Sequence, residues 1–482
     1  MKQEMPIDEI ISKVLEEQVV PALGCTESVA LGLATSIAYN AIRGKFPTWI
    51  KRHLKKKFDG FEVNPENIDE IFVKTDPNTW KNALNVGVPG SQGKYGHKIA
   101  IALGVFCVSS DDPKDKLMLF NDPEIEKKSF LANKLVEKKG KIKVVDLPFK
   151  KPPDEQAVYV ESKVKAKDEN GRIHEGIAVI EHNHTNVTSV EVDTLELLEK
   201  RGKPSNRYMN ALPSLFGEEK LSRIVDAIEK LLTKDKELIK RISDAIYKNK
   251  KASELGMGKK AGLRVGFTFQ KLIDEGRLSG DLANYSKVRT AAATDARMAG
   301  ENVTVMTCAG SGNLGLMASL PIITVAEGWR QDKERMIKAV ALSFLITCYV
   351  TRCSGVLSAF CGCAAKAGVG AAAGVTYYLG GNAEQIGYAI NNIAGNITGM
   401  ICDGAKEGCA MKLATAAGVA VESAFLALEN VKICPGNGIV FEKPPQTIQN
   451  IGEVATSMVE TDKAIVKILK KRGCFKKRNF SC

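Results

Sequence analysis

The chain has 482 residues, of which 44% are hydrophobic and 26% are charged. This balance excludes an intrinsically disordered or collagen-like chain, and the length is sufficient for two domains. The net charge of +12 keeps nucleic acid and acidic small molecules in view as partners. Twelve cysteines are too dilute for a disulfide scaffold, and the opening residues lack the apolar run of a signal peptide. We therefore expect a cytoplasmic protein with reduced thiols.

The first elements in chain order are two helices. Apolar residues at helical spacing predict one helix from Ile7 that ends before Pro21, and a second from about Thr26 to Gly44. Residues 45–67 are basic and interrupted by Pro and Gly, so we expect a surface insertion there.

Short β-branched runs alternate with turn residues between 68 and 192, which predicts a small antiparallel sheet. After residue 205, Ala, Gly and Leu dominate and helical periodicity takes over. The expected fold class is α+β, with an N-terminal α+β domain over 1–204 and a mainly helical domain over 205–482. The longest apolar run, 339–350, is shorter than the roughly 18 residues that a membrane span needs, so we interpret it as a core helix.

A glycine-rich segment contains Gly310, Gly312 and Gly315 in the spacing of a dinucleotide-binding loop. Pro321 follows closely and leaves little room for a crossover helix, and no acidic residue stands about 20 positions further on. A dinucleotide site is therefore disfavoured. Such a turn can still bind a carboxylate through backbone N–H groups, with Ser311 and Asn313 as further donors, and a tight packing turn is the alternative.

The cysteines fall into two groups. Cys107, Cys308 and Cys348 lie in apolar runs, which is typical of inert core thiols. Four others lie in glycine-rich segments, where backbone can approach a prosthetic group: Cys361, Cys363, Cys402 and Cys409. No CxxC pair is present, which argues against a zinc ribbon. Two residues two apart on a helix point to opposite sides, so at most one of the first pair is expected to be a ligand. Unrelated buried thiols remain the alternative.

Several sequence blocks, in order along nearly the whole chain, resemble the iron–sulfur L-cysteine desulfidases, which are relatives of the iron–sulfur L-serine dehydratase alpha chain. The blocks are PALGCTES, NVGVPG, HNHTNV, AGSGNLGLMASLP, LSAFCGCAA, NITGMICDGAKEGCAMK and PGNGIV. The resemblance implies a [4Fe–4S] cluster bound by Cys361, Cys402 and Cys409, with one iron left open as a Lewis acid. It also implies that Cys25 is the proton acceptor.

The position of Cys25 just before a helix predicts a pKa below that of a free cysteine. His97 is an alternative base. The resemblance further implies that family loops near the substrate contain Asn82, His184 and Asn186. For the substrate carboxylate we favour the turn of Ser311, Gly312 and Asn313.

The sequence departs from the family pattern at Leu314, where a polar residue is usual, so that contact to substrate is in question. The terminal Cys482 raises a second hypothesis, because a C-terminal cysteine can occupy the open iron in the related serine dehydratases.

The function expected from the resemblance is non-redox β-elimination of L-cysteine to pyruvate, ammonia and sulfide. A serine or threonine dehydratase with the same cluster is the alternative. A basic nucleic-acid-binding protein is a distant third reading, because the Lys clusters are dispersed and aromatic residues make up only 6% of the chain. We expect a small amino-acid substrate, neither nucleic acid nor a membrane as a partner, and a homodimer as a candidate assembly.

Overall fold

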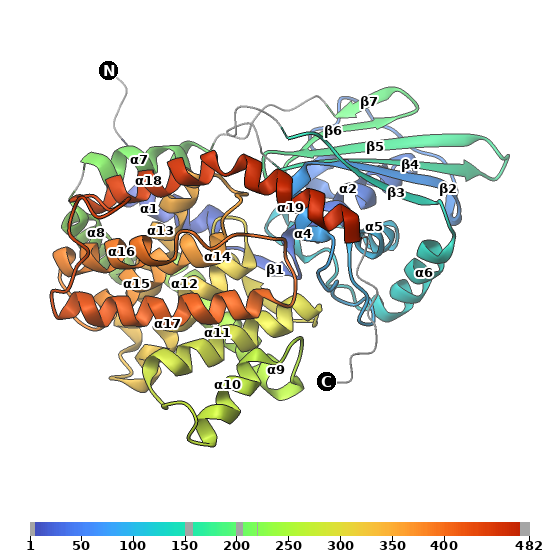
Figure 1. Ribbon diagram of the computed structural model, residues 1–482. Coiled ribbons are helices and arrows are strands. Elements are labelled where there is room, and N and C mark those ends of the chain that lie inside the picture. Colours follow the sequence, from blue (N-terminus) through green and yellow to red (C-terminus); the bar gives the residue numbers. More distant parts are fainter. Residues whose placement is uncertain (1–4, 150–157, 199–205, 219, 473–482) are drawn as a thin grey trace.

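The chain folds into a helix-covered sheet and a larger helical body that lie side by side (Figure 1). The computed structural model describes residues 5–149, 158–198, 206–218 and 220–472. The expected α+β class is confirmed by this combination of one main sheet and many helices.

The main sheet has six strands in the order β3-β2-β4-β5-β6-β7. They are β2 (Val63–Thr75), β3 (Ile142–Asp146), β4 (Tyr159–Asp168), β5 (Ile173–Glu181), β6 (Val187–Val192) and β7 (Leu195–Leu198). Buried and more exposed residues alternate along β4, because successive side chains of a strand point to opposite faces. Neighbouring strands are antiparallel as expected, except that β3 pairs with β2 in parallel after a long helical crossover.

Helix α2 (Thr26–Ile42) packs against β4, β5 and β6, and every one of its residues is buried. A helix without a polar face needs cover on all sides, and α5 (His97–Phe106) provides part of that cover. The segment predicted as a surface insertion is largely exposed, and it includes a short helix and the start of β2. The remaining helices of this half are α3 (Thr48–Lys51), α4 (Pro77–Ala83), η1 (Pro113–Met118) and α6 (Ile125–Glu137).

The helical body surrounds α15 (Ala367–Tyr378), which is buried along its whole length. It also contains α7 (Arg207–Glu218), α8 (Leu221–Lys234), α9 (Lys236–Lys259), α10 (Val265–Asp274), α11 (Leu282–Ala299), α12 (Gly312–Gly328), α13 (Lys333–Ser354), α14 (Gly362–Ala365), α16 (Ala383–Ile397), α17 (Cys409–Leu428), α18 (Pro444–Ser457) and α19 (Val459–Arg472). Helix α12 continues through Pro321, so the sequence argument that this proline leaves little helix is wrong. Packing by neighbouring helices compensates for the hydrogen bond that a proline removes.

The first helix and the first strand of the chain pack against the helical body. Helix α1 (Ile7–Gln18) packs on α7, α8 and α13, and β1 (Pro21–Leu23) pairs with β8 (Thr304–Met306). The chain then enters the sheet half through α2. The start of α2 therefore lies where the two halves meet, and the domain boundary at residue 204 stays a prediction.

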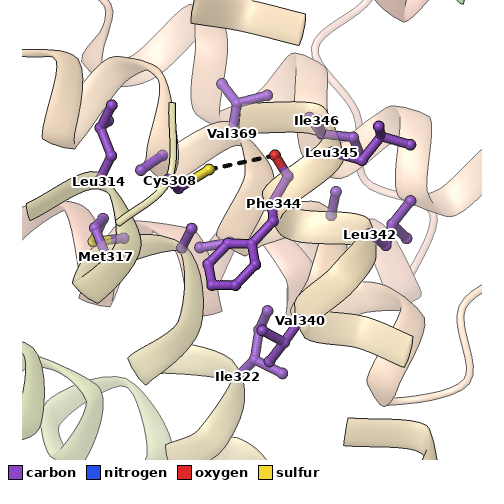
Figure 2. Close-up of a cluster of buried hydrophobic side chains, with 14 of the residues drawn as sticks. Cys308, Leu314, Met317, Ile322, Val340, Leu342, Phe344, Leu345, Ile346 and Val369 are labelled. Carbon is purple, nitrogen blue, oxygen red and sulfur yellow. Dashed lines mark hydrogen bonds between the residues drawn. The ribbon is translucent and has the colours of Figure 1, made fainter. Parts of the chain in front are cut away.

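Figure 2 shows part of the apolar core of the helical body. The expectation that Cys107, Cys308 and Cys348 are core thiols is confirmed, because all three are fully buried. The Cys308 thiol donates to the Phe344 carbonyl at 3.5 Å. Leu314 belongs to the same core cluster (Figure 2).

Two helices, α13 and α17, are long and apolar enough to cross a membrane by length and composition alone. Their most apolar windows are 72% and 56% buried within the fold, which is also what core helices give. Helix α13 contains the run 339–350 that we interpreted as a core helix.

A buried ion pair connects the two halves of the molecule. Helix α19 crosses from the helical body to α4 (Figure 1). There the Asp462 carboxylate accepts from Lys81 Nζ at 2.6 Å, and the two side chains are 3% and 1% exposed. Lys81 also donates to the Cys402 carbonyl oxygen at 3.1 Å. Gly404 completes this contact, because a Cβ there would lie 2.7 Å from the Lys81 carbonyl oxygen.

We predict that Asp462→Asn lowers the free energy of unfolding by about 3–5 kcal/mol, because it leaves the buried Lys81 ammonium without a counter-charge. The matched control is Asp59→Asn. Its pair with Lys57 is exposed, so the loss should stay below about 1 kcal/mol. Denaturant unfolding of both variants checks this, and equal losses would contradict the role of the buried pair.

Candidate active site

The carboxylate of Glu27, in the first turn of α2, is buried among hydrogen-bond donors. The Cys25 thiol donates to Oε2 at 2.9 Å and the Thr26 hydroxyl donates to the same oxygen at 3.0 Å. Asn82 Nδ2 donates to Oε1 at 2.8 Å. Burial raises the pKa of Glu27, but His184 and these donors outweigh burial, so the pKa is lowered. Glu27 is therefore a stable buried carboxylate.

Cys25 is the N-cap residue of α2, yet its thiol makes no capping hydrogen bond. Burial, followed by the Glu27 charge, raises the pKa of Cys25 well above its ordinary value, and Arg297 opposes this only in part. The expectation that the helix N-terminus lowers the pKa of Cys25 is therefore wrong. A buried thiol that donates to a carboxylate keeps its proton.

Asn82 and His184 reach Glu27 from two other elements. Asn82 lies in α4, and His184 lies between β5 and β6 with Nε2 at 3.9 Å from Glu27 Oε1. Burial lowers the pKa of His184, and the neighbouring carboxylates of Glu27 and Asp76 oppose this only in part. Among the described residues, neither Asn82 Oδ1 nor His184 Nε2 has a hydrogen-bond partner, although both atoms are buried. Such orphaned atoms are typical of a place where a ligand or water binds.

The turn before α12 is connected to the start of α2 by Arg297, which lies in α11. Arg297 Nη1 donates to Asn313 Oδ1 at 2.8 Å, and Nη2 donates to the Gly24 carbonyl at 2.6 Å. Gly312 packs on the guanidinium, since a Cβ there would lie 2.5 Å from Arg297 Nε. Ser311 is the N-cap of α12 and makes no capping bond through its side chain. The predicted carboxylate turn is thus joined to the residue before Cys25.

Two other predicted site residues, His97 and Asn186, lie in surroundings that differ from those of Cys25, Asn82 and His184. His97 is buried at the start of α5, where burial lowers its pKa to about 4 and both ring nitrogens lack partners. Its ring is tilted against Trp80, with the centroids 6.2 Å apart. Asn186 Nδ2 donates to the Glu181 carbonyl at 3.1 Å and so supports the turn between β5 and β6. In the described part of the chain, neither residue forms a hydrogen bond or an ion pair with Glu27.

The candidate cluster ligands lie on adjoining segments. An antiparallel bridge joins residues 360 and 401, and backbone hydrogen bonds of 2.6 and 2.7 Å flank it. Cys361 and Cys402 follow these bridged positions directly. Cys409 is the first residue of α17, and its sulfur lies 3.8 Å from the Gly404 carbonyl oxygen. The segment between Cys402 and Cys409, which contains Gly404 and Gly408, is largely a loop.

Cys363 is close to Cys361, which the spacing argument did not predict. Cys361 is the N-cap of the short helix α14 rather than a residue within it, so the opposite-sides rule for helical residues does not apply. A hydrogen bond from the Cys363 thiol lowers the pKa of Cys361. Cys363 therefore stays a candidate alternative ligand.

The surroundings of these thiols suit an anionic group. Lys366 is almost fully buried, and its Nζ donates to the Gly355 carbonyl at 2.5 Å. Lys412 donates to the Ile401 carbonyl at 2.7 Å, and Lys406 and Lys412 both pair with Asp403. Nearby cations favour thiolates over thiols, which opposes the burial that raises the pKa of Cys409 to about 12.

The described residues contain no group of three His, Cys, Asp or Glu side chains that could hold a single metal ion. A four-iron cluster offers each thiolate its own iron, so its ligands need not meet at one point. The soft sulfur donors and the lysines around them fit an iron–sulfur cluster.

Sequence reasoning missed three residues of this region: Glu27, Arg297 and Lys81. Glu27 could have been noticed, because it is the one charged residue in a helix that is buried along its whole length. Arg297 and Lys81 carry no local signal, since their importance arises from contacts with residues far away in the sequence.

The two departures from the family pattern have different outcomes. The Leu314 side chain is 3% exposed and packs in the helical core. It therefore takes no polar substrate contact. Cys482 lies outside the described residues.

Comparison with known proteins places this chain in a family. Residues 141–467 match the family described as serine dehydratase alpha chain. The matched region contains the candidate cluster cysteines but not Cys25. A UPF0597 protein of Desulfatibacillum aliphaticivorans is 35% identical over 467 residues, or 95% of this chain and 97% of the relative. A UPF0597 protein of Clostridioides difficile is 34% identical and covers 95% of this chain and 98% of its own length. The chain therefore belongs to the family of iron–sulfur lyases related to the serine dehydratase alpha chain.

Proposed function

We propose that the protein is an L-cysteine desulfidase that converts L-cysteine and water to pyruvate, ammonia and hydrogen sulfide. The observation that supports this best is the position of α4. Lys81 binds the backbone of Cys402, while the next residue, Asn82, binds Glu27. Glu27 in turn accepts from Cys25. A single helical turn thus connects the candidate cluster loop with the candidate proton-transfer group.

Cys361, Cys402 and Cys409 would hold a [4Fe–4S] cluster. With three protein ligands, such a cluster supplies an open iron that acts as a Lewis acid on the leaving sulfur. The lysines around the thiols favour their anionic form.

The remaining chemistry is proton transfer by the chain's own residues. Cys25 holds its proton in the resting site and has to lose it, once substrate is bound, before it can act as a base. The Glu27 carboxylate, which accepts from the thiol at 2.9 Å, is the nearest group to take that proton. The Cys25 thiolate then removes the Cα proton, and the C–S bond breaks with its electron pair on sulfur. The proton held by Glu27 leaves with the sulfide. The aminoacrylate that forms is hydrolysed to pyruvate and ammonia.

Substrate groups are assigned by their chemistry. Asn82 Oδ1 is a buried acceptor without a partner, which suits the substrate ammonium. His184 Nε2 is a second such atom. The turn of Ser311, Gly312 and Asn313 supplies donors for the carboxylate. Asn186 supports the loop of His184, and His97, with a pKa of about 4, stays neutral and is the alternative base.

The second candidate is a serine or threonine dehydratase, which is favoured by the family match over 141–467. L-cysteine and L-serine differ only in the atom that leaves, sulfur or oxygen. The same binding and proton-transfer groups would therefore serve both substrates.

We predict that anaerobically purified protein releases sulfide and pyruvate in equal amounts from L-cysteine, and forms pyruvate from L-serine or L-threonine at a lower kcat/KM. Sulfide and pyruvate assays with each amino acid measure this. A higher kcat/KM for L-serine would establish the second candidate and overturn the first.

We also predict that Cys25→Ala keeps its iron and loses turnover, whereas Cys402→Ala loses iron. The physical reason is that the first change removes the proton acceptor and the second removes a metal ligand. Iron analysis and the sulfide assay measure both effects. Cys434→Ala is the matched control, because Cys434 is exposed and should be silent in both assays. Loss of iron in Cys25→Ala with retention in Cys402→Ala would reverse the assignment.

A further inference from the structure

Arg297 is a buried cation without an anionic partner. Its side chain is 2% exposed, and within the described residues it forms no ion pair with a carboxylate. Burial of an uncompensated charge is costly. A protein that retains such a charge needs an anion to bind there.

The Arg297 guanidinium has more N–H donors than its hydrogen bonds within the protein use. An arginine carries five N–H donors in a planar fork. One bond goes to Asn313 Oδ1 and one to the Gly24 carbonyl. Nε is buried and has no hydrogen-bond partner in the part of the chain that the structure describes. The fork therefore has the capacity to bind a carboxylate through two parallel hydrogen bonds.

Two features of the neighbouring turn support an anion at this place. Helix α12 begins without a side-chain cap, so its first N–H groups are available, and its dipole favours negative charge. Gly312 lets the start of α12 approach the guanidinium closely, because a Cβ there would lie 2.5 Å from Nε.

We propose that Arg297 binds the α-carboxylate of the amino-acid substrate, together with the N-terminus of α12. This proposal rests on the proposed function in that the ligand is an amino acid, but not on whether sulfur or oxygen leaves. The contact of Arg297 with Gly24 then fixes the carboxylate relative to the adjacent Cys25, which sets the position of the Cα proton.

The test compares L-alanine with ethylamine, which differ only by the carboxylate and lack a leaving group. Calorimetry on the full-length protein, prepared without oxygen, measures both dissociation constants. We expect the wild type to prefer L-alanine. Arg297→Gln should weaken L-alanine binding roughly 10- to 100-fold and leave ethylamine unchanged. A purely structural role for Arg297 would weaken both ligands together.

The matched control is Arg289→Gln, in the same helix, whose guanidinium pairs with Glu327 and which should keep the preference. If Arg297→Gln does not fold, Asn313→Asp serves instead. It gives the guanidinium a carboxylate inside the protein, so it should fold and lose the preference for L-alanine.

Retention of the preference in either site variant, or its absence in the wild type, would overturn the proposal. Failure of the proposed function looks different, because L-cysteine would then release no sulfide while the binding of L-alanine still depended on Arg297.

Discussion

Burial of the Glu27 carboxylate is the constraint around which the active-site region is organised. A carboxylate away from water is stable only when donors surround it. Here those donors come from the start of α2 and from α4, while His184 of the β5–β6 loop lies 3.9 Å from the carboxylate. The same requirement that stabilises the charge therefore brings Cys25, Asn82 and His184 together. A substitution that removed the charge would release all three elements from their common partner.

The second buried charge, on Lys81, extends this organisation to the helical body. Lys81 is paired with Asp462 from α19 and donates to the backbone of Cys402. The Tyr95 hydroxyl adds another link, donating to Glu407 at 2.5 Å. The loop between Cys402 and Cys409 is thus held against the half of the molecule that carries Cys25. The relative position of the two halves is therefore fixed by directional hydrogen bonds and an ion pair, in addition to apolar packing.

The sequence identifies helices and candidate site residues better than it identifies the groups that surround those residues in the fold. The α+β class and the helix before Pro21 follow from periodicity, and the family blocks identify the cysteines that the fold brings to adjoining segments. The pKa of Cys25 was predicted wrongly because a local rule about helix ends takes no account of Glu27 and burial. Arg297 could not be found, since its partners Gly24 and Asn313 come from distant segments. The parallel pairing of β3 likewise depends on a crossover that alternation does not reveal.

We propose that the segments carrying Cys361, Cys402 and Cys409 hold an iron–sulfur cluster within reach of a substrate bound beside Cys25. The most direct measurement is the visible absorption spectrum of protein kept free of oxygen, recorded before and after addition of L-cysteine. The account predicts a brown protein with about four irons per chain and a spectrum that changes when the substrate binds. A colourless, iron-free protein that still released sulfide from L-cysteine at full rate would contradict it.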